Sequence, residues 1–126
     1  MKLASGLIVA LTTFSLGLSL SVAPRAIRAY RHKEVLKREF VLRAELLKVR
    51  KAIDLYSIEK RFPPRSLDQL VEAEYLSEIP IDPITRKRDW EEVITDLRGG
   101  LDIVILEDVH STSTAVSSEG IPYCEW

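Results

Sequence analysis

The feature that most constrains this chain is an uncharged apolar run close to its first residue. Residues 3–23 carry no charged side chain and are almost wholly aliphatic, small or hydroxylated. At about 1.5 Å per residue, a helix of this length spans roughly 30 Å, the thickness of a bilayer's hydrocarbon layer. We therefore predict that residues 1–23 form a transmembrane anchor. The anchor residues, with the proline that follows them, are Leu3, Leu7, Leu11, Phe14, Leu18 and Pro24.

A cleavable secretory signal is the alternative interpretation of this run. Lys2 provides a positive start, and Ser21-Val22-Ala23 resembles a small-x-small cleavage site. However, Pro24 would follow the cut, where proline is poorly tolerated, and the run is longer than the roughly 7 to 15 residues of a signal core. The retained anchor is therefore the preferred prediction.

The charges of the remaining chain are sharply divided. Residues 24–51 carry ten Lys or Arg and three Glu, whereas residues 52–126 carry seven Lys or Arg and sixteen Asp or Glu. The single cysteine, Cys124, excludes an internal disulfide. We expect three parts: the anchor at 1–23, a basic amphipathic stalk at 24–60 and a small acidic head at 61–126.

The stalk has the pattern of a long helix that continues from the anchor through a kink at Pro24. No Gly or Pro occurs between Arg25 and Lys60, and these are the residues that most readily break helices. Glu39 and Arg43 lie four apart in the acid-first order that favours helix pairs. One continuous bent helix, from Leu3 to about Lys60, is the prediction.

An apolar stripe along the stalk is expected to pack on the head. Its members recur at alternating steps of four and three, which places them on one helix face: Leu42, Leu46, Val49, Ile53 and Tyr56. Three further apolar residues are expected to broaden the same face: Phe40, Leu47 and Leu55.

The head carries signals for a short helix and a hairpin. The two prolines in residues 61–64 end the long helix, and Ser66 is a good N-cap for a short one. Residues 89–96 and 101–109 are strand candidates joined by the turn pair Gly99-Gly100. The fold class is therefore α+β: a long helix packed on a small head with a short helix and an antiparallel hairpin or small sheet. The tail at 121–126, which contains a Tyr and a Trp, is expected to dock on the head.

An ordered series of short motifs gives the chain a specific resemblance. The motifs are Leu42-Arg-Ala-Glu-Leu, Arg50-Lys-Ala-Ile-Asp-Leu-Tyr, Arg61-Phe-Pro-Pro, Ser66-Leu-Asp-Gln-Leu-Val, Tyr75-Leu, Ile79-Pro-x-Asp-Pro, Asp89-Trp, Asp108-Val-His-Ser, Gly120-x-Pro-Tyr and Trp126. Together with the apolar N-terminal helix, they resemble the type IV pilin and pseudopilin family, and within it the major (G-type) pseudopilins of type II secretion. The resemblance implies a pilin-like fold and a structural filament subunit in the bacterial envelope that supports protein secretion, not an enzyme.

The resemblance also implies partners and a location. The partners would be copies of the chain, other pilin-like subunits, an inner-membrane platform with its secretion machinery, and the lipid bilayer. The location would be the inner membrane, with a single span and a periplasmic head. The alternative function is an extracytoplasmic binding module, single-pass or secreted, that does not polymerise.

Two features depart from the family pattern. When Pro24 is matched to the family's helix proline, Lys2, Leu3 and Leu7 occupy the positions of the Gly, Phe and Glu that direct prepilin processing and methylation. Either this chain is not processed in that way, or its start codon is misplaced. The positive-inside rule, which counts the cations after the anchor, favours a cytoplasmic head. We follow the family in placing the head outside.

No catalytic constellation emerges from the sequence. His32, His110 and Cys124 are scattered, and a lone His is usually a solvated or packed residue. The basic stalk lacks the interleaved aromatics of a nucleic-acid-binding helix, so no nucleic acid is expected.

The only ligand that the sequence indicates is calcium. Calcium takes several oxygen ligands, and the C-terminal loop supplies carboxylates and hydroxyls in Asp108, Ser111, Ser117 and Glu119. The resemblance points the same way, because major pseudopilins bind calcium in this loop. No other cofactor is expected.

Overall fold

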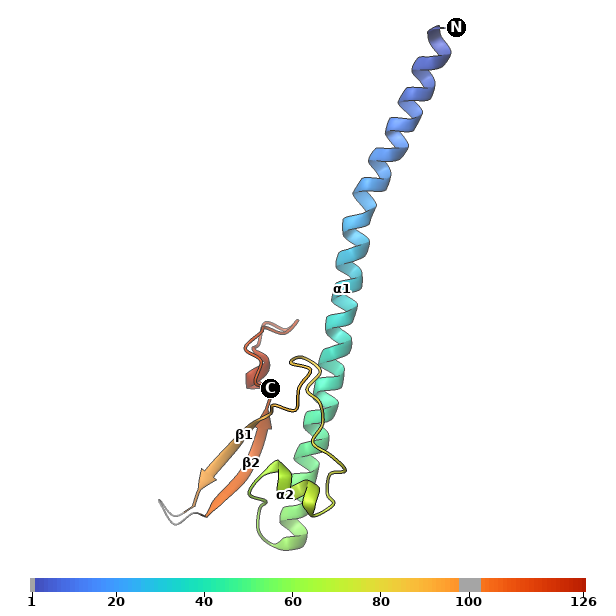
Figure 1. The fold of residues 1–126 in the computed structure, drawn as a ribbon. Coiled ribbons are helices and arrows are strands. Elements are labelled where there is room, and N and C mark those ends of the chain that lie inside the picture. The colour runs from blue at the N-terminus through green and yellow to red at the C-terminus, as the bar shows by residue number, and fades with distance from the viewer. Residues whose placement is uncertain (1, 98–102) are drawn as a thin grey trace. The chain divides into compact units, whose positions relative to one another are not determined.

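The computed structural model describes the backbone of residues 2–97 and 103–126, and side chains from residue 24 onward. The chain divides into two compact units, Met1–Val35 and Leu36–Trp126. The second unit contains part of the stalk as well as the head, because the stalk contributes to the head's core. The elements in order are α1 (Lys2–Lys60), α2 (Leu67–Glu72), β1 (Glu91–Asp96), β2 (Val104–His110) and the 3-10 helix η1 (Tyr123–Glu125) (Figure 1).

The long helix is confirmed from Pro24 to Lys60, and Pro24 lies inside α1 without ending it. The side chains of residues 1–23, including Leu3, Leu7, Leu11, Phe14 and Leu18, lie outside the described part of the chain, so the predicted anchor stays a prediction. Among the described residues, no helix has the length and apolar character needed to span a membrane.

Local backbone signals end α1 and start α2 as expected. Arg61, directly after α1, has a φ of 56°, the left-handed conformation that terminates many helices. Ser66 then caps α2, since its Oγ accepts a hydrogen bond from the Gln69 N–H at 3.2 Å. The Gln69 side chain in turn accepts one from the Arg65 N–H at 2.7 Å. The predicted short helix is therefore confirmed together with its N-cap.

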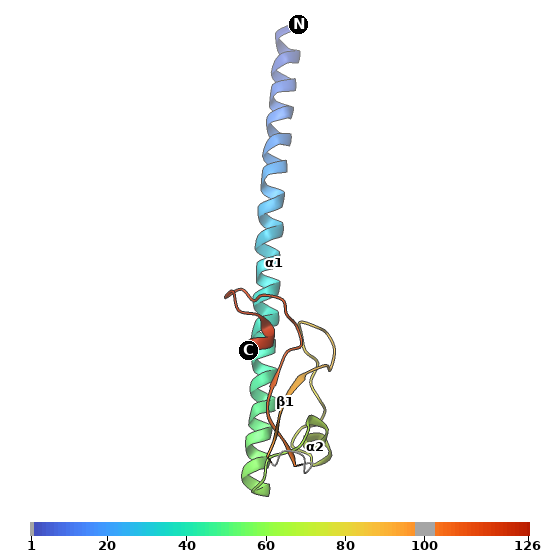
Figure 2. The ribbon, with the colours of Figure 1, turned by 90° about the vertical axis from the view of Figure 1, so that its left-hand side faces the viewer.

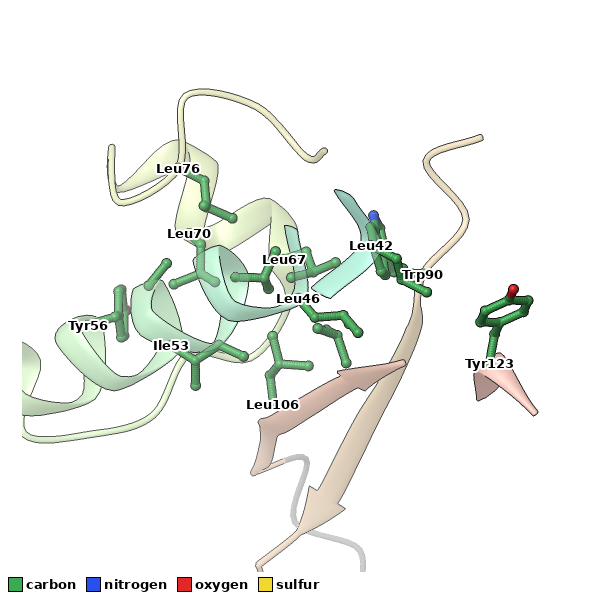
Figure 3. Close-up of a cluster of buried hydrophobic side chains, with 13 residues drawn as sticks. Leu42, Leu46, Ile53, Tyr56, Leu67, Leu70, Leu76, Trp90, Leu106 and Tyr123 are labelled. Atoms are coloured by element: carbon green, nitrogen blue, oxygen red, sulfur yellow. The ribbon is translucent and has the colours of Figure 1, made fainter. Parts of the chain in front are cut away.

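The core of the second unit forms where α1, α2 and the hairpin meet, and both views show α2 and the strands beside the C-terminal half of α1 (Figure 2). The α1 members of the core, each at most 9% exposed, are the five residues of the predicted stripe, Leu42, Leu46, Val49, Ile53 and Tyr56, and in addition Ala52. The α2 side chains Leu67 and Leu70 pack against them, as do Trp90 and Leu106 (Figure 3). Burying each such Leu contributes about 1.5 to 3 kcal/mol.

The three residues expected to broaden the core face do not do so. Phe40, Leu47 and Leu55 are 75%, 54% and 49% exposed. At 3.6 residues per turn, each lies roughly 140 to 160° around the helix from Leu42. They are therefore on the opposite side of α1, and this part of the sequence interpretation was wrong.

The predicted hairpin is confirmed as the antiparallel pair β1 and β2, although each strand starts later than expected. The turn pair Gly99-Gly100 lies outside the described residues. Ile94 pairs with Leu106 and Val93 with Asp108, so Glu107 is an extra, unpaired residue of β2. This bulge moves the core-facing positions from a period of two to a step of three. Leu106 and Val109 are consequently both fully buried.

Candidate assembly surface and C-terminal segment

A second apolar stripe runs along the solvent side of α1, opposite the core. It consists of Leu36, Phe40, Leu47 and Ile58, which at 3.6 residues per turn fall within roughly 40° of one another. All four are exposed, and Phe40 and Ile58 are about three-quarters so, at 75% and 74%. We call these four residues the outer stripe. Lys51 and Asp54 interrupt this stripe between Leu47 and Ile58. Several large apolar side chains exposed on one helix face are a feature of interaction sites.

Two grooves flank the outer stripe and share Leu47 as their common wall. The first, of about 490 Å³, lies between α1 and the end of the chain and is lined by Leu47, Ile121 and Trp126, among others. The second, of about 580 Å³, lies between α1 and the segment after α2 and includes Leu55 and Leu76. Leu47 therefore stands on a ridge with an open groove on either side.

The rims of both grooves carry charge. Arg43 and Arg50 line the first groove, together with Glu119 and Glu125. Lys48 and Lys51 line the second, and a carboxylate oxygen of Glu45 lies 3.6 Å from Lys48. An apolar ridge bordered by ion pairs suits packing against another polypeptide that supplies both apolar and charged groups.

Arg50 holds β2 and the end of the chain against α1. Its Nε donates to Asp108 Oδ1 at 2.7 Å, and its Nη2 donates to the backbone oxygens of Val109 and Trp126 at 3.2 and 2.9 Å. Burial raises the pKa of Asp108, but the hydrogen bonds and charge of Arg50 outweigh this and lower the pKa overall. The sequence interpretation treated Arg50 only as one of the stalk cations.

The tail docks as expected. Tyr123 is 5% exposed, and its ring meets that of Trp126 edge to face at 5.3 Å. The Arg43 guanidinium lies over the Trp126 ring, 4.4 Å from its centroid, in cation–π geometry. His110 Nδ1 lies 2.7 Å from the Trp126 backbone oxygen.

Glu39 of α1 is a buried carboxylate that contacts the same part of the chain. Its Oε1 accepts hydrogen bonds from the Ser118 N–H at 2.6 Å and from the Tyr123 hydroxyl at 2.9 Å, while Oε2 accepts one from Ser118 Oγ at 2.5 Å. Burial raises the pKa of Glu39, but these bonds and the nearby Arg43 charge outweigh it and lower the pKa. Burial and the bond to Glu39 raise the pKa of Tyr123 to about 12.

The structure gives each predicted calcium ligand a partner within the protein. Asp108 pairs with Arg50 and Glu119 with Arg43. Ser111 is fully buried and its hydroxyl donates to Asp82, while Ser117 Oγ accepts from the N–H groups of Glu119 and Ile121. Within the described ranges, no group of three or more His, Cys, Asp or Glu side chains is placed to hold a metal ion.

Asp82 connects two of the sequence motifs, the one that starts at Ile79 and the one that starts at Asp108. It is fully buried, and its Oδ1 accepts hydrogen bonds from the N–H groups of Ile84 and Thr85 at 2.7 and 3.4 Å. Its Oδ2 accepts the Ser111 hydroxyl at 2.5 Å. The Asp82-Pro83 turn is thereby tied to the residue that follows β2.

Comparison with known proteins assigns no relative, because no family model, curated protein or solved structure matches the chain. The function proposed below therefore follows the motif resemblance, and the outer stripe, the grooves beside it and the charge distribution are the structural features that support it.

Proposed function

We propose that this chain is a pilin-like structural subunit of a type II secretion or type IV pilus-like filament in the bacterial envelope, where it supports protein secretion. Residues 1–23 anchor it in the inner membrane with a single span, and the head lies on the periplasmic side. Its partners are copies of itself, other pilin-like subunits, the inner-membrane platform of the secretion machinery and the bilayer.

The observation that carries this proposal is that α1 has two apolar faces. One face, from Leu42 to Tyr56, is buried in the core that α1 forms with the head. The other, the outer stripe, is left open to solvent although it includes Phe40 and Ile58. A helix that is apolar on both sides has more apolar surface than its own domain covers. Packing against neighbouring subunits removes the remaining surface from water.

The charge division supports the same arrangement. Residues 24–51 carry an excess of cations and residues 52–126 an excess of carboxylates. Subunits stacked with an axial offset would bring the stalk of one copy beside the head of the next, where opposite charges attract. Between 0.1 M and 1 M salt the screening length falls from about 10 Å to 3 Å, so assembly should weaken over this range. Assembly that is insensitive to salt would contradict the stalk-to-head contacts.

Photocrosslinking in native membranes tests the proposal. A benzoylphenylalanine at position 47 should give a ladder of products at multiples of the 14.3 kDa subunit mass. The same probe at position 72, on the exposed α2 residue Glu72, is the matched control and should give a much weaker ladder. Monomer alone at position 47, or a single crosslink to an unrelated protein, would instead favour the binding module that does not polymerise.

A further inference from the structure

Among the α1 side chains that hold residues 117–126, which include Arg43 and Arg50, Glu39 is the buried acid. Glu39 is 4% exposed although it is a carboxylate. Its three hydrogen bonds come from Ser118 and Tyr123, which are 79 and 84 residues away in the sequence. Hydrogen bonds to an ionised acceptor are about twice as strong as neutral ones. A single carboxylate of α1 thus contacts this terminal segment at two places, Ser118 and Tyr123.

In all of these contacts the terminal segment donates hydrogen bonds, as a site that binds an anion does. Ser118 directs its N–H and its hydroxyl at Glu39, and the Tyr123 hydroxyl points to the same carboxylate. A cation site requires the reverse, with several oxygen lone pairs directed at one point. In this segment Ser117 Oγ accepts from backbone N–H groups, and Glu119 is paired with Arg43.

From these contacts we infer that the Glu39 carboxylate anchors residues 117–126 in place of a divalent cation, so that the order of this segment does not depend on calcium. The inference does not require the chain to form filaments. If the chain does form filaments, Glu39 also affects the surface through which subunits pack, because Glu119, Ile121 and Trp126 of the segment that it holds line the groove beside Leu47.

Hydrogen exchange of the full chain in detergent micelles tests the inference. In the unaltered chain, exchange of peptides covering residues 117–126 should be the same in millimolar calcium and in a chelator. In Glu39→Gln the charge is lost and one oxygen is replaced by an NH₂ donor, so exchange of the same peptides should rise at least tenfold. Glu72→Gln, which removes an exposed carboxylate on α2, should leave exchange unchanged. Peptides covering residues 42–56 report whether the core stays folded.

A second variant keeps the test decisive if Glu39→Gln unfolds the whole unit. Tyr123→Phe retains the buried ring and removes only the hydroxyl that donates to Glu39, and it should raise exchange of the segment about threefold. Two results would overturn the inference: a chelator that accelerates exchange of residues 117–126 tenfold in the unaltered chain, or Glu39→Gln and Tyr123→Phe segments that exchange like the unaltered one.

Discussion

Two leucines of α1 provide a matched pair that tests the division of the helix into a core face and an open face. Leu42 is 0% exposed and Leu47 is 54% exposed, and they are five residues apart on the same helix. Truncation of a buried Leu to Ala costs about 2 to 5 kcal/mol, since it removes transfer free energy and leaves a cavity. For Leu42→Ala we expect the upper half of that range, because its side chain is enclosed by the core. For Leu47→Ala we expect less than about 1 kcal/mol, because only part of its surface is covered.

Thermal unfolding of the full chain in detergent measures the difference. Tryptophan fluorescence reports on the head, since Trp90 is 8% exposed in the core and Trp126 lies in the docked tail. Trp126→Phe in both variants isolates the signal of Trp90. In a domain of this size 1 kcal/mol shifts the melting temperature by about 4 to 8 °C. Leu42→Ala should therefore lower it by more than about 12 °C, whereas Leu47→Ala should leave it nearly unchanged while reducing crosslinked multimers. Equal losses of melting temperature in the two variants would show that the outer stripe is packed within the subunit, and would refute the reasoning.

Three further predictions concern single polar groups. Ser66→Ala should lower the free energy of unfolding by about 1 kcal/mol because α2 loses its N-cap, and denaturant titration with Ser66→Thr as the control would show it; equal stability of the two variants would contradict the cap. Asp82→Ala should cost about 2 to 4 kcal/mol, since it leaves the buried Ser111 hydroxyl and two partly buried N–H groups without an acceptor, whereas exposed Glu91→Ala should cost little in the same titration. Because the pKa of Glu39 is lowered in the folded protein, this carboxylate stabilises the fold above its ordinary pKa of 4.5, and the stabilisation is lost as the pH falls through the folded-state pKa. Because the pKa of Tyr123 is raised to about 12, the stabilisation from its hydroxyl is lost as the pH rises from 10 towards 12. Acid melts of Glu39→Gln and alkaline melts of Tyr123→Phe should each show a smaller decline than the unaltered chain, with the lowered pKa of Asp108 accounting for part of the acid decline that remains. An unchanged decline in either variant would assign it to another group.

The elements with local signals could be predicted from the sequence. The absence of Gly and Pro predicted α1 beyond Pro24, Ser66 marked the start of α2, and two strand candidates on either side of Gly99-Gly100 predicted the hairpin. The step pattern from Leu42 to Tyr56 also identified a core stripe, because a helix face is specified by spacing alone. These features depend on residues within one or two turns of each other.

The contacts that define the candidate site could not be predicted in this way. Glu39 looked like the partner of Arg43 in a helix pair, yet it binds residues about 80 positions later, and Arg43 pairs with Glu119 instead. Apolar character alone also misassigned Phe40 and Leu47 to the core, although counting degrees around the helix would have separated them from Leu42. The pairing of distant polar groups depends on tertiary structure, which spacing in the sequence does not encode.

The bulge in β2 has a consequence for which length changes the head can tolerate. Because Glu107 is the extra residue, its deletion would restore strict alternation and leave Leu106 and Val109 together on the core face. Deletion of Asp108 would instead remove the carboxylate that pairs with Arg50. A deletion in the exposed stretch 114–116 would remove the Ala115 carbonyl that accepts the Tyr123 N–H, or the bridge between Val116 and Pro122, and so release the terminal segment. Within this part of the head, loss of Glu107 should therefore be tolerated better than a shorter loop after β2.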